Sequence, residues 1–203
     1  ITFSYAASRV LGFFREILLA NWAGVSEATD TLDLAFIIPD FLFYLSAGGY
    51  LAITLIPIMS EKKKSELNNY FLSILYGMSL IFVIFSLITY SFRFQFAELL
   101  GVTSLDFFVE VFTPIIFSQV FFFVGAILMS YQYFHDNFKY AAIAPVVYNS
   151  TIIFFGWINS STPEGTIKGF AIGTLIGSVL GHFLIQIYGA KRSGLSFYLI
   201  SPK

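Results

Sequence analysis

The first forty residues place charged side chains inside stretches that are otherwise apolar. The segment "SRVLGFFREILLA" (8–20) holds Arg9, Arg15 and Glu16. The stretch that follows it holds three acids, Asp30, Asp33 and Asp40. An arginine guanidinium stays charged at any physiological pH and binds phosphate oxygens through two parallel hydrogen bonds. These residue types therefore indicate recognition of an anion, with the acids as ion-pair partners.

The spacing of these residues predicts how they share helix faces. Arg9 and Glu16 are seven residues apart and fall on nearly the same face, whereas Arg15 points about 120° away. The three acids are spaced three and seven residues apart, so they also share a face. We expect a helical hairpin with cations on one arm and acids on both, in which Arg15 pairs with Asp30.

A charge inside a membrane-spanning helix costs at least about 2.5–3.5 kcal/mol and therefore needs a cavity or a partner. One interpretation makes Arg9, Arg15 and Asp30 substrate-binding residues of a hydrated cavity. Glu16, Asp33 and Asp40 are then further cavity or ion-pair residues. In a second interpretation, Arg15 and Asp30 form a structural ion pair, and the Arg9 side chain extends so that its charged end reaches the lipid headgroups. The hypothesis we carry forward is that Arg15 is held by Asp30 and Arg9 is available to an anionic headgroup.

The composition is that of a membrane protein. Of 203 residues, 57% are hydrophobic and 11% are charged, compared with about 25% charged in soluble domains. Cysteine is absent and the net charge is −1, which argues against disulfides, a thiolate metal site and nucleic-acid binding. The sequence has no HExxH, GxSxG or Walker motif, so we expect no enzyme activity, no metal and no cofactor.

The elements that must position the charges are apolar segments long enough to span a membrane, which takes about 20 residues. We expect an all-α bundle of six transmembrane helices. The second should be bent or broken, because it is long and contains Pro39 and Pro57. The approximate spans are 1–23, 29–59, 69–92, 108–133, 141–158 and 167–189.

The loops between these spans alternate in charge. One set, 60–66, 135–139 and 190–194, holds six lysines and arginines. The other set, 24–30, 91–106 and 159–165, holds only Arg93. The positive-inside rule predicts that the first set and the N-terminus are cytoplasmic. Lys62, Lys63 and Lys64 then act as topology determinants, with anionic lipid as an alternative contact.

The sixth span has a stripe of glycines at every fourth position, Gly169, Gly173, Gly177 and Gly181. Such a stripe permits close helix packing, which we favour over direct substrate contact. His182 lies beside the stripe, where a packing role is favoured over proton coupling.

The segment 8–42 with "IPIMSE" (56–61) closely resembles the opening helices of the MurJ/MviN family of lipid II flippases. "GAIL" (125–128) and "FKYAAIAPVVYN" (138–149) resemble the family's stretch around its fourth and fifth helices. Members belong to the multidrug/oligosaccharidyl-lipid/polysaccharide exporter superfamily, in which two six-helix lobes face a central cavity. The resemblance implies that residues 1–203 form the N-terminal lobe and that a C-terminal lobe lies outside this chain. Because residue 1 is isoleucine and not methionine, we also expect the start to be trimmed.

The resemblance also implies that Arg9, Arg15 and Asp30 correspond to charged cavity residues required for flipping. Where the family carries paired arginines and an acid, this sequence has Phe43, Tyr44 and Gly48, which removes cations from the cavity.

Three functions remain open. The leading one is a flippase in the bacterial cytoplasmic membrane that moves lipid II, an undecaprenyl-pyrophosphate-linked glycan, by alternating access. Its partners are then this substrate and the surrounding membrane lipids. The alternatives are an exporter of another polyprenyl-linked oligosaccharide and a transport-dead membrane scaffold.

Overall fold

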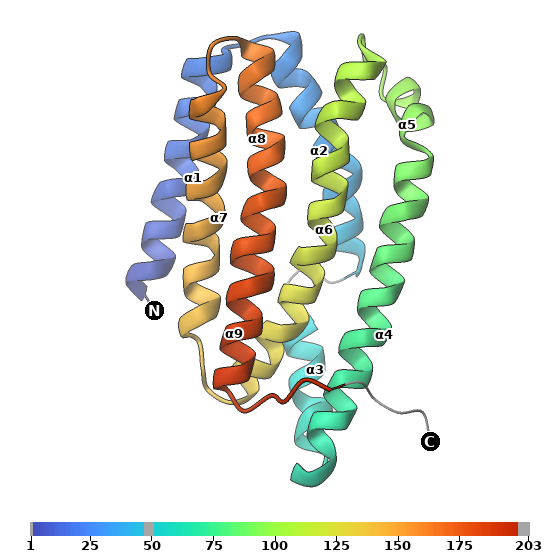
Figure 1. Ribbon diagram of the computed structural model, residues 1–203, viewed down its shortest axis with the longest axis vertical. Helices are drawn as coiled ribbons and strands as arrows, with labels where there is room; N and C mark the ends of the chain where they lie inside the picture. Colours follow the sequence, from blue (N-terminus) through green and yellow to red (C-terminus); the bar gives the residue numbers. More distant parts are fainter. Residues whose placement is uncertain (1, 47–50, 199–203) are drawn as a thin grey trace.

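The computed structural model describes residues 2–46 and 51–198, with the side chains of 2–5, 42–46, 51–53 and Lys64 excepted. Within these ranges the chain is helical and has no strand. The helices run up and down and pack side by side in one bundle (Figure 1). They are α1 Thr2–Ala23, α2 Glu27–Ser46, α3 Leu51–Ser60, α4 Lys64–Ser91, α5 Arg93–Leu99, α6 Leu105–Phe134, α7 Lys139–Ile158, α8 Pro163–Gly177, the π-helical η1 Ser178–Leu184, and α9 Ile185–Arg192.

Four helices in the described part of the chain are long and apolar enough to cross a membrane: Ser65–Ser91, Leu105–Phe134, Lys139–Ile158 and the continuous rod Pro163–Arg192. They match the last four predicted spans. The first two predicted spans are more polar, because α1 carries three charged residues and α2 carries four. The predicted membrane helix bundle is confirmed, whereas the count of six spans is approximate.

The second predicted span is described as two helices, α2 and α3, on either side of residues 47–50. Pro39 lies inside α2 and Pro57 inside α3. The predicted loop 91–106 differs from the expectation, because it contains the short helix α5. Its small residue Ala97 is fully buried, and Arg93 stacks on the rings of Tyr90 and Phe94. These contacts stabilise a helix that is too short to be predicted from hydropathy.

Helix α6 is the central element of the bundle. It packs against α2, α3, α4, α5, α8, η1 and α9. Phe108, Phe112, Ile115 and Ile116 in its first half are fully buried in one apolar cluster, and Ile127 and Leu128 in its second half belong to another. In water, burial of each such side chain stabilises a fold by about 1.5–3 kcal/mol. In the bilayer this hydrophobic contribution is largely absent, and van der Waals packing between the helices stabilises the bundle instead.

The glycine stripe lies against the backbone of α7. A Cβ atom added at Gly173 would lie 2.7 Å from Ile152 Cα, and one added at Gly177 would lie 3.0 Å from the Tyr148 carbonyl oxygen. The flanking glycines, Gly169 and Gly181, face the carbonyls of Phe155 and Ala144. The stripe therefore lets α7 and α8–η1 approach more closely than side chains would permit.

The two sets of loops lie at opposite ends of the bundle. Figure 1 shows 61–63, 135–138 and the segment after α9 at the lower end, and 24–26, 100–104 and 159–162 at the upper end. Lys62 and Lys63 are exposed at the lower end, and the Lys62 ammonium lies 4.5 Å from the centre of the Tyr70 ring. The alternation of the loops follows the predicted order.

Candidate functional site

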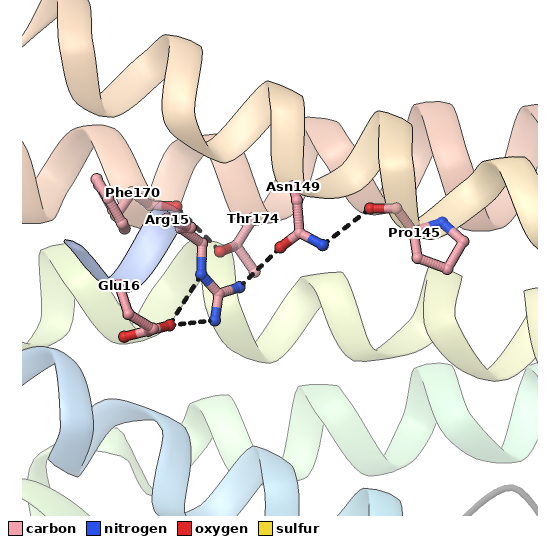
Figure 2. A network of polar contacts seen from close by, with 6 residues as sticks. All are labelled: Arg15, Glu16, Pro145, Asn149, Phe170 and Thr174. Atoms are coloured by element: carbon pink, nitrogen blue, oxygen red, sulfur yellow. Dashed lines mark hydrogen bonds and ion pairs between the residues drawn. The ribbon is translucent and has the colours of Figure 1, made fainter. Parts of the chain in front are cut away.

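Arg15 lies on α1 with 28% of its side chain exposed. Its Nε and Nη2 groups both donate to Glu16 Oε1, at 3.0 and 2.5 Å, and its Nη1 group donates to Asn149 Oδ1 of α7 at 3.3 Å (Figure 2). The guanidinium therefore joins α1 to a helix that lies 134 residues further along the chain.

Asn149 is a site residue that the sequence analysis did not single out. It is 8% exposed, and its Nδ2 group donates to the Pro145 carbonyl oxygen at 2.9 Å (Figure 2). An asparagine is costly in an apolar helix unless its amide is hydrogen-bonded. Its position in "APVVYN", four residues after a proline within an apolar span, is the signal that could have found it.

The Arg15 side chain lines a cavity of about 430 Å³ between α1, α2, α7 and α8. Its polar lining consists of Arg15, Glu16, Asp33, Asp40, Tyr148 and Thr174. The structure thus brings together four of the six charged residues that the sequence analysis assigned to a cavity or its ion pairs. Asp33 and Asp40 are seven residues apart, which turns both toward the same side of α2.

The predicted ion pair between Arg15 and Asp30 is wrong, because Arg15 pairs with Glu16 of its own helix. Asp30 lies in the first turn of α2, whereas Arg15 lies eight residues before the end of α1. At 1.5 Å per residue the two side chains start about 7 Å apart along the bundle axis. The adjacent Glu16 is nearer and takes the ion pair.

Arg9 and Asp30 are exposed and do not line this cavity. The other ion pair among the described residues joins Lys168 to Glu110. Phe43 and Tyr44, as side chains, and Gly48 lie outside the described residues. His182 packs beside two aromatic rings, 4.3 Å from the Phe122 centroid and 5.6 Å from that of Tyr148, which agrees with a packing role.

The arrangement is suited to binding a phosphate group at one wall of the cavity. Three of the five N–H donors of the Arg15 guanidinium make the described hydrogen bonds. The other two have no partner among the described residues, and donors of this kind bind phosphate oxygens strongly. The described residues contain no group of His, Cys, Asp and Glu side chains that could hold a metal ion.

Comparison with known proteins gives one consistent result. The sequence model of the family "Lipid II flippase MurJ" matches residues 19–202. A lipid II flippase MurJ of Thermosipho africanus is 32% identical over 194 residues, which cover 91% of this chain and 40% of the relative. That of Burkholderia cenocepacia is 27% identical over 202 residues, covering 91% of this chain and 38% of the relative.

A solved structure of a lipid II flippase MurJ in an inward closed conformation superposes with a TM-score of 0.78 and 27% identity. The superposition covers 98% of this chain and 43% of the other. The chain therefore spans about 40% of the length of the relatives that it matches.

Proposed function

Because the chain belongs to the lipid II flippase MurJ family, we propose that residues 1–203 form the N-terminal lobe of a flippase that moves lipid II across the bacterial cytoplasmic membrane. The remaining length of the relatives leaves room for a second lobe of comparable size. The two lobes alternate in exposing a shared cavity to either side, and no covalent bond is made or broken. The substrate is a pyrophosphate joined to an undecaprenyl chain and a glycan.

The observation that carries this proposal is the half-buried guanidinium of Arg15 at the wall of a polar cavity. A permanent cation within a membrane helix is retained where it has a partner or a function. Glu16 satisfies one edge of the guanidinium, and two N–H groups remain for the oxygens of a pyrophosphate.

The other charged residues act around Arg15. Arg9 lies six residues nearer the N-terminus of α1 and is exposed, so it can meet the headgroup as the substrate enters. Asp33 and Asp40 give the opposite wall a negative charge that favours release of an anion after transport. Asp30 lies at the upper end of the hairpin of α1 and α2, outside the cavity.

The distribution of positive charge supports an orientation with the N-terminus in the cytoplasm. The lower end of the bundle in Figure 1 carries the loops with six lysines and arginines, whereas the upper loops carry Arg93. Cytoplasmic loops of membrane proteins are rich in lysine and arginine.

A related exporter of another polyprenyl-linked oligosaccharide is the second candidate. It is considered because Phe43 and Tyr44 replace two cations that the resemblance leads us to expect, although the relatives named above are lipid II flippases. Such an exporter retains the need for a cation at the pyrophosphate, because the lipid carrier is the same.

Growth of bacteria depleted of their own lipid II flippase tests the proposal. The full-length protein should restore growth, and Arg15→Ala should fail to do so at the same level in the membrane. If the parent protein reaches the membrane and does not restore growth, lipid II is not its substrate. If Arg15→Ala restores growth as well as the parent, the role given to Arg15 is wrong.

A further inference from the structure

The geometry points to a second residue of the same site: Asn149 is a positioning residue that holds the Arg15 guanidinium against α7 without neutralising it. This inference rests on the proposed function, because it assigns Arg15 to an anionic substrate. Asn149 itself has no role in contacting that substrate.

The orientation of the Asn149 amide is fixed by its own helix. Nδ2 donates to the Pro145 carbonyl oxygen, which can only accept a hydrogen bond. The amide oxygen must then point the other way, where it accepts from Arg15 Nη1 at 3.3 Å. Figure 2 shows this chain of contacts from Pro145 through Asn149 to Arg15.

The helix that carries Asn149 is rigidly packed. Its helix, α7, packs backbone to backbone with α8–η1 through the glycine stripe, and the neighbouring residue Tyr148 faces Gly177. Asn149 is buried, so its hydrogen bond to Arg15 competes little with water. An acceptor held in this way restricts the long arginine side chain to one direction, which lowers the entropy lost on binding an anion.

A neutral acceptor also preserves the charge of Arg15. Glu16 already offsets part of that charge through a contact of 2.5 Å. A carboxylate at position 149 would add a second negative charge and would also set an oxygen against the Pro145 carbonyl. An amide meets both requirements, because it donates to the carbonyl and accepts from the arginine.

The test follows the side chain of Arg15 by NMR in the full-length protein with ¹⁵N-labelled arginine. The Arg15 Nε–Hε resonance is assigned by its loss in Arg15→Lys, and inorganic pyrophosphate is titrated in. In Asn149→Leu this resonance should shift before any ligand is added, and the apparent Kd for pyrophosphate should rise by up to about 10-fold, as expected when one long side chain must be ordered on binding. Asn149→Asp should raise the Kd further.

Asn159→Leu is the matched control. Asn159 lies at the end of the same helix, and its Nδ2 group also donates to a carbonyl four residues earlier, that of Phe155, without contacting an arginine. This variant should leave the Arg15 resonance and the Kd unchanged. Asn149→Ala serves as a second variant if leucine disturbs folding.

An unchanged Arg15 resonance and Kd in the folded Asn149 variants would overturn the inference. If the Arg15 resonance of the parent protein does not shift when pyrophosphate is added, this result would instead count against the proposed anion site. In that case the resonance of the ligand-free Asn149→Leu variant still decides whether Asn149 orients Arg15.

Discussion

At the scale of single residues, the proposed role of Arg15 implies that the charge balance around it should govern how strongly the cavity holds an anion. The cavity contains one cation and three acids, Glu16, Asp33 and Asp40. Glu16 alone is in direct contact with the guanidinium. A transporter must both bind and release its substrate, and an acid beside the binding cation weakens binding.

Glu16→Gln should therefore strengthen substrate binding. The glutamine keeps a hydrogen-bond acceptor for Arg15 but removes the negative charge, so the KM for lipid II should fall by about 1.4- to fivefold. This corresponds to the 0.2–1 kcal/mol typical of exposed ion pairs. Slower release of the substrate should also lower kcat.

The matched control is Glu110→Gln, which alters an ion pair of similar exposure between Glu110 and Lys168 away from the cavity. Its KM should equal that of the parent when transport is measured over a range of lipid II concentrations. Equal shifts in both variants would attribute the effect to the general charge of the lobe.

The sequence identified the charged residues but could not identify their partners. Helix periodicity gives the direction in which a side chain leaves its helix, so Asp33 and Asp40 were correctly expected on one face. Asp30 was expected with them, but it is exposed outside the cavity. It does not give the height of one helix against another, and the Arg15–Asp30 pair was wrong for this reason. Asn149 was missed because an amide in an apolar helix carries no charge to mark it.

At the scale of elements, the packing of α7 against α8 should be sensitive to single methyl groups. Gly173→Ala would set its Cβ 2.7 Å from Ile152 Cα, whereas Gly177→Ala would set it 3.0 Å from Tyr148 atoms. Overpacking of this kind typically destabilises by about 1–3 kcal/mol. We therefore expect a lower Tm for both variants, with Gly173→Ala the more affected.

Gly77 of α4 provides the control, since nothing lies within 4 Å of a Cβ added there. Gly77→Ala should leave the Tm unchanged or raise it, because alanine is the better helix former by about 1 kcal/mol. A Tm for Gly173→Ala equal to that of Gly77→Ala would contradict the close contact between α7 and α8.

The last four spans were predictable because each is a long apolar run bounded by charged or turn-forming residues. The predicted span 141–158 corresponds to α7 Lys139–Ile158, and 108–133 corresponds to α6 Leu105–Phe134. The short helix α5 was not predicted. It depends on tertiary contacts, such as burial of Ala97, that no local pattern contains.

At the scale of the whole molecule, the loops at the two ends of the bundle should face opposite sides of the membrane. Ser65 is exposed at the end with the lysines and Ser104 at the other end. The chain contains no cysteine, so Ser65→Cys and Ser104→Cys each introduce one thiol into it. A membrane-impermeant maleimide added to intact cells should label Ser104→Cys alone.

Permeabilised cells supply the control for this labelling, since both variants should then react. Labelling of both positions from outside intact cells would refute the topology, and labelling of Ser65→Cys alone would invert it.

The central claim is that this chain is one lobe of a lipid II flippase whose Arg15 binds the pyrophosphate. Its most direct test measures the lipid II exposed on the outer face of the membrane in cells that depend on the full-length protein. We predict that Arg15→Ala lowers this exposure by about 10- to 150-fold, the loss of about 1.5–3 kcal/mol expected for hydrogen bonds to a charged group. Arg15→Lys should recover part of it, because the charge is kept and the second parallel bond is lost. Outer-face lipid II in Arg15→Ala equal to that of the parent, at equal protein level, would contradict the account.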